Sequence, residues 1–505
     1  MRALSLPYIL LAIAPATLGA PGPGPRSAQQ QQFHLAAQAV SAVSGSQAPL
    51  PDPPAQGHVQ LLDSDGKHER YDGHQVWRLD WARLSTRVKD NILNAADSLG
   101  LDIWRASSTT FDVRVPPLSQ SILRSLLPAD LVSTYIPDVQ ALLDSAPVAD
   151  DPLPGDGGDD DDVWNVTTLA SPFHDGYHTL DQVYQFGEAL VSHFNIVTSY
   201  DIGTTAEGRP IRAWSAKIDE EATPGIPEDG GDAHDENDKF EFIIQANQHA
   251  REWVSSSAAM YFLHSLVLDA TADSTSHAAQ LLRTFTFTVV AVVNPDGFTY
   301  SHEHSRLWRK NRQDVGGLLC KADSPGIDLN GNWGHKFVPS RLACSESYSG
   351  QTAFEAHETR AMADYLVNGS NPEAGRTLPI KAFIDLHSYG QLFMFPFAYS
   401  CADFPPDAEN LMEAGLGVAK AMRMTTQGEG YQTGQACDLT YRSAGDAIDY
   451  SYAVADVRWS YSAELRDTGT YGFVLPPHLI RPTGEEVSAG LRYLATFIFD
   501  TEIDL

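Results

Sequence analysis

The segment Phe240-Glu-Phe-Ile-Ile-Gln-Ala246 is followed, two residues later, by His249-Ala-Arg-Glu-Trp253. The first segment is mostly apolar and short, which predicts a buried strand. Residues 254–267 read as a helix. The pattern therefore places an imidazole and a carboxylate, three positions apart, at a turn from a strand into a helix.

His249 and Glu252 can face one cation at this spacing, so a third ligand must come from elsewhere. His387 is the candidate, because it follows a second apolar segment, Pro379-Ile-Lys-Ala-Phe-Ile384. Two histidines and a glutamate with an open fourth position form a catalytic zinc arrangement. The sequence thus predicts one bound Zn²⁺. The alternative for a single histidine at a strand end is a structural, hydrogen-bonded residue.

A zinc hydrolase needs three further groups. Glu464 is the candidate general base, since a carboxylate in an apolar strand is costly unless it is used or paired. Arg309 is the candidate cation for a developing oxyanion. Asp328 is a candidate partner that orients one of the imidazoles. An ordinary ion pair is the alternative for each residue taken alone.

Strands alternate with helices through residues 171–505. This order predicts an α/β domain with a mixed, largely parallel sheet covered by helices on both faces. Sites in such sheets collect at the carboxyl ends of strands, where His249 and His387 both fall. The sequence thus predicts that both histidines lie at one edge of the sheet.

The N-terminal third predicts four segments. Residues 1–20 combine one positive charge with a short apolar run, as in a signal peptide. Residues 21–55, rich in Pro, Gln, Ala and Ser, predict a disordered arm. Residues 56–146 alternate strand and helix patterns as a small α+β open sandwich. Residues 147–170 contain an acidic Gly/Pro linker, so a proenzyme cleaved in this region is expected.

The chain has 505 residues and a formal net charge of −31 at pH 7. That charge disfavours nucleic acid and anionic membranes as partners. No later stretch is long and apolar enough to span a membrane. We therefore expect a monomer that follows the secretory route and ends outside the cell, in a vacuole or at the cell wall.

The four cysteines suggest two disulfides in a secreted chain, with three pairings possible. A zinc–thiolate site is disfavoured because no CxxC pair exists. Asn165-Val-Thr and Asn368-Gly-Ser are glycosylation acceptor sequences. These features agree with the predicted secretory route.

Residues 177–499 resemble the zinc metallocarboxypeptidases of the carboxypeptidase A/B type, and residues 56–146 look like the inhibitory pro-domain of that family. The matching stretches occur in family order. They are Tyr177-His-Thr-Leu, Glu207-Gly-Arg-Pro-Ile211, His249-Ala-Arg-Glu-Trp253, Asn294-Pro-Asp-Gly297, Leu307-Trp-Arg-Lys-Asn-Arg312, Gly326-Ile-Asp-Leu-Asn330, Tyr348-Ser-Gly, Ala353-Phe-Glu, His387-Ser-Tyr389, Tyr441 through Asp449, and Glu464-Leu-Arg-Asp-Thr-Gly469 with Tyr471-Gly-Phe473.

The resemblance implies a role for each matching position. The zinc ligands, the base Glu464 and the carbonyl-polarising Arg309 agree with the assignments above, and the substrates would be peptide and protein C-termini. Substrate contacts are implied for Arg251, Asn330, Ser388, Tyr389, Tyr441 and Ile448. The family's loop disulfide would be Cys320–Cys344. Cys401 and Cys437 fall where some members carry a second bridge.

One position departs from the family motif. The family has an arginine after the asparagine, and it clamps the terminal carboxylate of the substrate. Gly331 stands there instead, in Asp328-Leu-Asn-Gly331. A bidentate, charge-assisted pair cannot be formed by a residue without a side chain. Lys336 or Arg312 could replace the missing charge from nearby.

This departure leaves two alternatives to a carboxypeptidase made as a proenzyme. One is a zinc-binding pseudoenzyme of weak or no activity, with a binding or cell-wall-related role. The other is a zinc amidase or endo-acting hydrolase, which would not need the carboxylate clamp. By the resemblance, Ile448 falls at the position that floors the specificity pocket, where an apolar residue resembles the A-type enzymes and implies apolar C-terminal residues. Asp446 could instead favour a basic residue, or could be a solvated turn residue.

Overall fold

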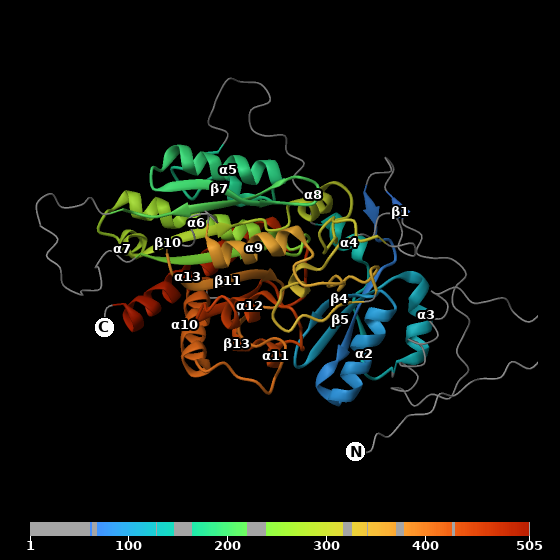
Figure 1. Ribbon diagram of the computed structural model, residues 1–505. Coiled ribbons are helices and arrows are strands. Elements are labelled where there is room, and N and C mark those ends of the chain that lie inside the picture. Colours follow the sequence, from blue (N-terminus) through green and yellow to red (C-terminus); the bar gives the residue numbers. More distant parts are fainter. Residues whose placement is uncertain are drawn as a thin grey trace, which may run out of the picture.

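A computed structural model of the chain describes residues 61–62, 68–127, 129–145, 164–219, 239–316, 326–340, 342–369, 378–426 and 430–503. The expected signal peptide and arm, and most of the linker, lie outside these residues. A small N-terminal unit packs against one side of a larger unit (Figure 1). Among the described residues, no helix is long and apolar enough to cross a membrane.

The larger unit is built on an eight-stranded mixed sheet. The inner strands β14, β11, β9 and β10 pair in parallel, and antiparallel pairs lie toward both edges. This confirms the predicted α/β class. In order across the sheet the strands are β13 (Gln432–Gln435), β12 (Leu392–Phe395), β14 (Trp459–Leu465), β11 (Ile380–Ser388), β9 (Phe240–Ala246), β10 (Phe285–Val290), β8 (Pro210–Ala216) and β7 (Val197–Thr204).

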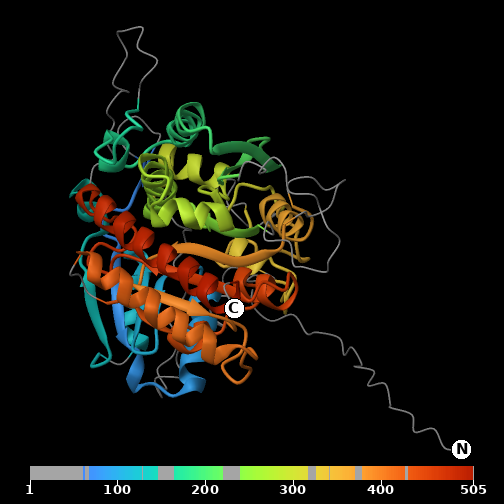
Figure 2. The same cartoon turned by 90° about the vertical axis from the view of Figure 1, so that its left-hand side faces the viewer.

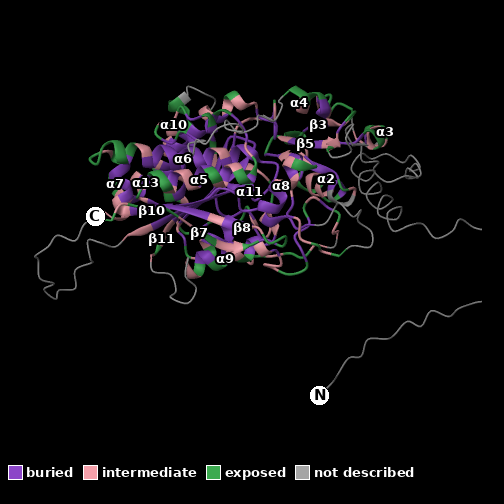
Figure 3. Cartoon of the chain, turned by 90° about the horizontal axis from the view of Figure 1, so that it is seen from above, coloured by how far each residue is buried: buried purple, intermediate pink, exposed green. Residues whose placement is uncertain are grey.

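Helices cover both faces of this sheet. The first face packs against α5 (Leu180–His193), α6 (Trp253–Ala272), α7 (His277–Thr284), α10 (Ala408–Thr426) and α13 (Ile480–Glu502). The second face packs against α9 (His357–Asn368), α11 (Ala436–Leu439) and α12 (Ala447–Ala453). Helices α10 and α13 run side by side (Figure 2), and the inner strands β14, β11, β9 and β10 are largely buried between the layers (Figure 3). Helix α8 (Pro295–Glu303) follows β10.

The alternation of side chains along each strand decides which face carries the polar residues. In β11, Ile384 and Leu386 enter the core under α6, whereas Phe383 enters the core under α9 and α12. Because neighbouring side chains point to opposite faces, His387 lies on the same face as Phe383. In β14, Ala463 and Leu465 enter the first core, so Glu464 lies on the second face as well.

The N-terminal unit is a four-stranded antiparallel sheet in the order β4-β5-β3-β6. One face packs on α2 and α3. The other face packs on the larger unit, where Val76 and Trp104 share a buried cluster with Tyr389 and Phe473. Its elements are β1 (Leu61–Leu62), β2 (Glu69–Arg70), β3 (Gln75–Asp80), α2 (Thr86–Ser98), β4 (Asp102–Ala106), β5 (Thr110–Val115), α3 (Pro117–Leu126), β6 (Val132–Ile136) and α4 (Val139–Ser145).

Candidate metal centre

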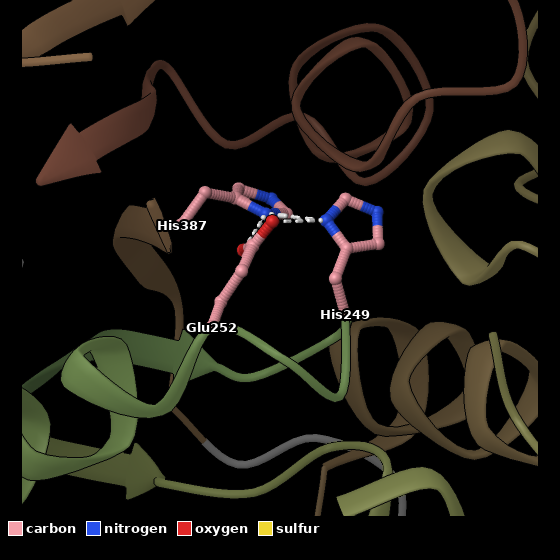
Figure 4. A group of neighbouring side chains, drawn as sticks. All are labelled: His249, Glu252 and His387. Atoms are coloured by element: carbon pink, nitrogen blue, oxygen red, sulfur yellow. Dashed lines mark hydrogen bonds and ion pairs between the residues drawn. The ribbon is translucent and has the colours of Figure 1, made fainter. Parts of the chain in front are cut away.

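Three side chains, two from the connection between β9 and α6 and one from β11, converge at the carboxyl ends of β9 and β11 (Figure 4). His249 lies in the turn after β9, Glu252 immediately precedes α6, and His387 lies near the end of β11. Glu252 Oε1 lies 2.8 Å from His249 Nδ1, and Glu252 Oε2 lies 3.0 Å from His387 Nδ1. The two Nδ1 atoms are 3.2 Å apart. We call these three residues the histidine cluster.

The histidine cluster fits a zinc ion by its chemistry and its shape. One ligand atom from each residue lies within 4.8 Å of the others, and all three residues are buried. Two imidazole nitrogens and a carboxylate oxygen are donors that zinc prefers in catalytic sites. Nitrogen lone pairs that face each other across 3.2 Å repel unless a proton or a cation lies between them. The arrangement is therefore suited to a shared cation.

The far nitrogen of each imidazole meets a carboxylate. His249 Nε2 lies 3.2 Å from Asp328 Oδ1, and His387 Nε2 lies 2.8 Å from Asp385 Oδ2. The hydrogen bond between His387 Nε2 and Asp385 fixes the tautomer in which His387 Nδ1 is left free to bind a metal, whereas His249 Nε2 lies at ion-pair distance from Asp328 without hydrogen-bond geometry. Asp328 Oδ2 also accepts a hydrogen bond of 3.0 Å from Arg309 Nη2. Arg309 is thereby held beside the histidine cluster.

Glu464 lies next to His387 on the neighbouring strand. The two residues are direct partners in the parallel register of β14 and β11. Glu464 Oε2 is buried and has no hydrogen-bond partner among the described residues. Burial and the charge of Glu252 raise the pKa of Glu464 to about 8, against the opposing effects of His387 and Arg309. This is the environment of a carboxyl that can exchange a proton near neutral pH.

The charges of the cluster depend on one another. Burial opposes ionisation of Glu252, but His249 and His387 outweigh it and lower the pKa of this carboxyl. Burial opposes protonation of His387, but Asp385 and Glu252 outweigh it and raise the pKa of the imidazole. In the histidine cluster, Glu252 is therefore favoured in its ionised form and His387 in its protonated form.

One of the residues implied to contact substrate touches the histidine cluster directly. Ser388 donates its backbone N–H to Glu252 Oε2 at 3.2 Å. Ile448 is buried in the core of the second face. The Tyr441 ring is partly exposed, and the pKa of its phenol is raised by burial and by the charges of Asp328 and Glu464. These residues come from β11, α12 and the loop before α12.

Arg251 and Tyr389 lie where the two units meet. Arg251 Nη1 lies 2.8 Å from Asp102 Oδ1 on β4, and its guanidinium lies 4.0 Å from the centre of the Phe473 ring. Arg114 shares the same carboxylate, with Nε 3.0 Å from Asp102 Oδ2. The Tyr389 ring packs edge-on against Phe473. The N-terminal unit therefore covers both residues.

Gly331 lies at the end of the short turn η3 (Leu329–Gly331). Its neighbour Asn330 donates from Nδ2 to Asp446 Oδ2 at 3.2 Å and accepts from the backbone N–H of Ala447 at 2.9 Å. Asp446 Oδ1 accepts from the backbone N–H of Ile448 at 3.1 Å and so caps α12. Asp446 is thus a buried carboxyl rather than a solvated turn residue. We call Asn330, Gly331 and Asp446 the Asn330 cluster.

The cysteines and the glycosylation acceptors lie away from the histidine cluster in the sequence. Cys401 and Cys437 form a disulfide. Cys344 is also disulfide-bonded, and its expected partner Cys320 lies outside the described residues. Asn165 is exposed, and Asn368 is half-buried at the end of α9. Glycosylation of both asparagines stays a prediction.

Three polar residues of this region were missed by the sequence analysis. Asp385 lies two positions before His387, on the same face of β11, so strand alternation could have revealed it. Gln248 donates from Nε2 to Asp385 Oδ2 at 2.6 Å, but nothing in its sequence context signals this contact. Asp102 forms an ion pair with Arg251, 149 positions away in the sequence, and no local sequence pattern could predict this contact.

Comparison with known proteins agrees with this geometry. A family model described as zinc carboxypeptidase matches residues 183–490. The "Inactive metallocarboxypeptidase ecm14" of Talaromyces marneffei is 33% identical over 434 residues, covering 81% of this chain and 69% of that protein. The relative of the same name from Sclerotinia sclerotiorum is 33% identical over 468 residues, covering 85% and 73%.

Two solved structures share the fold. The crystal structure of carboxypeptidase A from Helicoverpa armigera matches with a TM-score of 0.68 at 23% identity, covering 86% of this chain and 100% of that chain. Thrombin activatable fibrinolysis inhibitor matches with a TM-score of 0.67 at 24% identity, covering 85% and 100%.

The fold and the site define an α/β protein with a candidate metal centre at the carboxyl ends of its strands. The match to the family model and the identity with the relatives show that the chain belongs to the zinc carboxypeptidase family.

Proposed function

We propose that this chain is a zinc-dependent hydrolase that releases the last residue from peptides and proteins. His249, Glu252 and His387 would hold one zinc ion. The observation that carries the proposal is Glu464, a half-buried residue in register with His387 whose Oε2 atom is buried and lacks a hydrogen-bond partner among the described residues. A chain that only bound peptides would gain nothing from this group, because leaving a buried carboxyl oxygen without a hydrogen bond costs free energy.

Each residue of the site would act at a stated atom. Glu464 would take a proton from the attacking water and return it to the leaving nitrogen. Arg309, held by Asp328, would donate N–H groups to the developing oxyanion. Tyr441 would close over the substrate from its partly exposed position. A zinc ion, when bound, supplies Lewis-acid activation of the water and the carbonyl.

The second candidate is a zinc-binding protein without turnover. Two observations favour it: the relatives from T. marneffei and S. sclerotiorum carry the word "inactive" in their names, and Gly331 removes the expected carboxylate clamp. Neither observation touches Glu464 or the histidine cluster. We therefore place hydrolysis first.

We further propose that the chain is a secreted proenzyme. Residues 56–146 would act as an inhibitory pro-domain, because Asp102 pairs with Arg251 and because Trp104 packs on the Phe473 ring. Residues 1–20 would direct secretion, and a cut within residues 147–170 would separate the two units. The disulfide Cys401–Cys437 agrees with an oxidising compartment.

The test is release of the last residue from N-blocked dipeptides that end in Phe, Leu, Lys or Arg. The protein is first cut within residues 147–170, and each assay is run with and without a zinc chelator. We expect release that the chelator abolishes. One zinc per chain without release would instead favour the binding protein.

A further inference from the structure

Gln248 is a fully buried residue that joins the two elements carrying the histidines of the metal centre. It lies in the turn after β9, directly before His249, and its Nε2 donates to Asp385 Oδ2 on β11 at 2.6 Å. The same Asp385 oxygen lies 2.8 Å from His387 Nε2. One hydrogen-bonded path therefore runs from the turn that holds His249 to the imidazole of His387.

The Gln248 amide is held in one orientation by its other partners. Trp333 Nε1 donates to Gln248 Oε1 at 3.1 Å, and the indole is fully buried. An indole N–H can only donate, so this contact identifies the amide oxygen and leaves Nε2 to face Asp385. Nε2 also lies 3.4 Å from Asn330 Oδ1. The backbone is fixed as well, because Asn294 Nδ2 donates to the Gln248 carbonyl at 3.0 Å.

The Asp385 carboxylate depends on two donors. Its Oδ2 accepts from Gln248 and from His387, whereas its Oδ1 is buried and has no hydrogen-bond partner among the described residues. Loss of the Gln248 amide would leave His387 as the one side chain, in the described part of the chain, that holds this carboxylate. A carboxylate bonded to a ligating imidazole orients the ring and raises the basicity of the metal-binding nitrogen.

Gln245 provides a comparison on the same face of the sheet. Gln245 and Asp385 are direct neighbours in the parallel register of β9 and β11. Ile243 and Phe383 enter the core of the second face, so alternation places Gln245 and Asp385 on that face too. Gln245 is fully buried, but neither of its amide atoms has a hydrogen-bond partner among the described residues. Proximity in the sheet alone therefore does not supply the donor to Asp385.

We propose that Gln248 is a positioning residue for the zinc ligand His387 and that it acts through Asp385. This inference rests on the proposed function, because it concerns the metal that hydrolysis would use. Gln248 orients the Asp385 carboxylate, the carboxylate accepts from His387 Nε2, and His387 Nδ1 is thereby aimed at the metal. Because Gln248 directly precedes His249, the same hydrogen bond ties the turn after β9 to β11.

The test compares Gln248→Met with Gln245→Met in the full chain, stripped of metal and titrated with zinc against a competing chelator. Methionine is unbranched, similar in length to glutamine and unable to donate a hydrogen bond. We expect Gln248→Met to weaken zinc binding by about tenfold, and Gln245→Met to leave it unchanged. Equal affinities in the three proteins, or equal losses in the two variants, would overturn the inference alone. No zinc binding by the unmodified chain would contradict the proposed function as well.

A double-mutant cycle tests whether the effect passes through Asp385. Asp385→Ala removes the carboxylate, so adding Gln248→Met to it should weaken zinc binding by at most about twofold further. A second loss of about tenfold in the double variant would show that Gln248 acts by another route and would overturn the inference.

A spectroscopic measurement separates positioning of the ligand from a general loss of stability. Co²⁺ bound in place of zinc reports the geometry of its ligands through its visible absorption. The spectrum should change in Gln248→Met and match that of the unmodified protein in Gln245→Met. An unchanged spectrum in Gln248→Met would show that His387 keeps its position without the amide, which would contradict the proposed role.

Discussion

The histidine cluster and the Asn330 cluster are neighbours that differ in completeness. In the histidine cluster the far nitrogen of each imidazole meets a carboxylate, and Glu464 lies in register with His387. In the Asn330 cluster the expected arginine is absent and Asp446 takes the asparagine's donor. The comparison shows one cluster in which each expected side chain is present, next to one in which the expected cation is replaced by Gly331.

The strongest way to break this comparison is to remove a ligand. His387→Ala should abolish stoichiometric zinc and reduce hydrolysis to background, because a catalytic zinc site needs three protein ligands and only two would remain. Metal content by mass spectrometry is the measurement. His304→Ala, a change at an exposed histidine, is the control and should keep one zinc. Full zinc content in both His249→Ala and His387→Ala would contradict the metal assignment.

Glu464→Gln separates metal binding from catalysis. The amide cannot take a proton, so kcat should fall by about 10²–10⁴-fold. Zinc content should stay at one per chain, since Glu464 is not a proposed ligand. Unchanged turnover in this variant would exclude Glu464 as the base.

Asp102→Ala tests how much the ion pair between the N-terminal unit and Arg251 contributes to the free energy of unfolding. Arg251 and Arg114 would lose a shared buried carboxylate, and breaking such a pair costs about 3–5 kcal/mol. Denaturant unfolding of the uncut chain should show this loss. Asp130→Ala removes the exposed pair with Arg83 and should cost at most about 1 kcal/mol. Equal losses in the free energy of unfolding would show that the buried interface pair stabilises the chain no more than the exposed pair does.

Asp385→Asn tests whether the carboxylate beside His387 Nε2 contributes to zinc affinity. The change weakens the partner of His387 Nε2, so zinc affinity should fall by about 10–100-fold. A chelator competition titration measures the affinity. Unaltered affinity would mean that the orientation of His387 is set by the packing of β11 alone.

Much of the fold and the metal site could be predicted from the sequence because the signals are local. The strand before His249, the spacing to Glu252 and the strand before His387 each fit within a few residues. The same is true of Gly331, which departs from a short motif. The sequence could not reveal that Asp446 bonds to Asn330, because that contact joins positions 116 apart.

The contacts between the two units could not be predicted from local sequence patterns either. Asp102 occurs in an alternating strand where an acidic residue reads as solvent-facing. Its burial against Arg251 depends on how two separately folded sheets pack. Such contacts are fixed by tertiary structure and leave no periodic trace in the sequence.

The central claim is that the histidine cluster and Glu464 form a working hydrolytic centre in this chain. The most direct measurement determines zinc content and chelator-sensitive hydrolysis on one preparation of cut protein, with N-blocked dipeptides that end in Phe, Leu, Lys or Arg. The account predicts one zinc per chain and release of the last residue from at least one of these substrates, lost on chelation and restored by zinc. One zinc per chain with no release from any of them would contradict it.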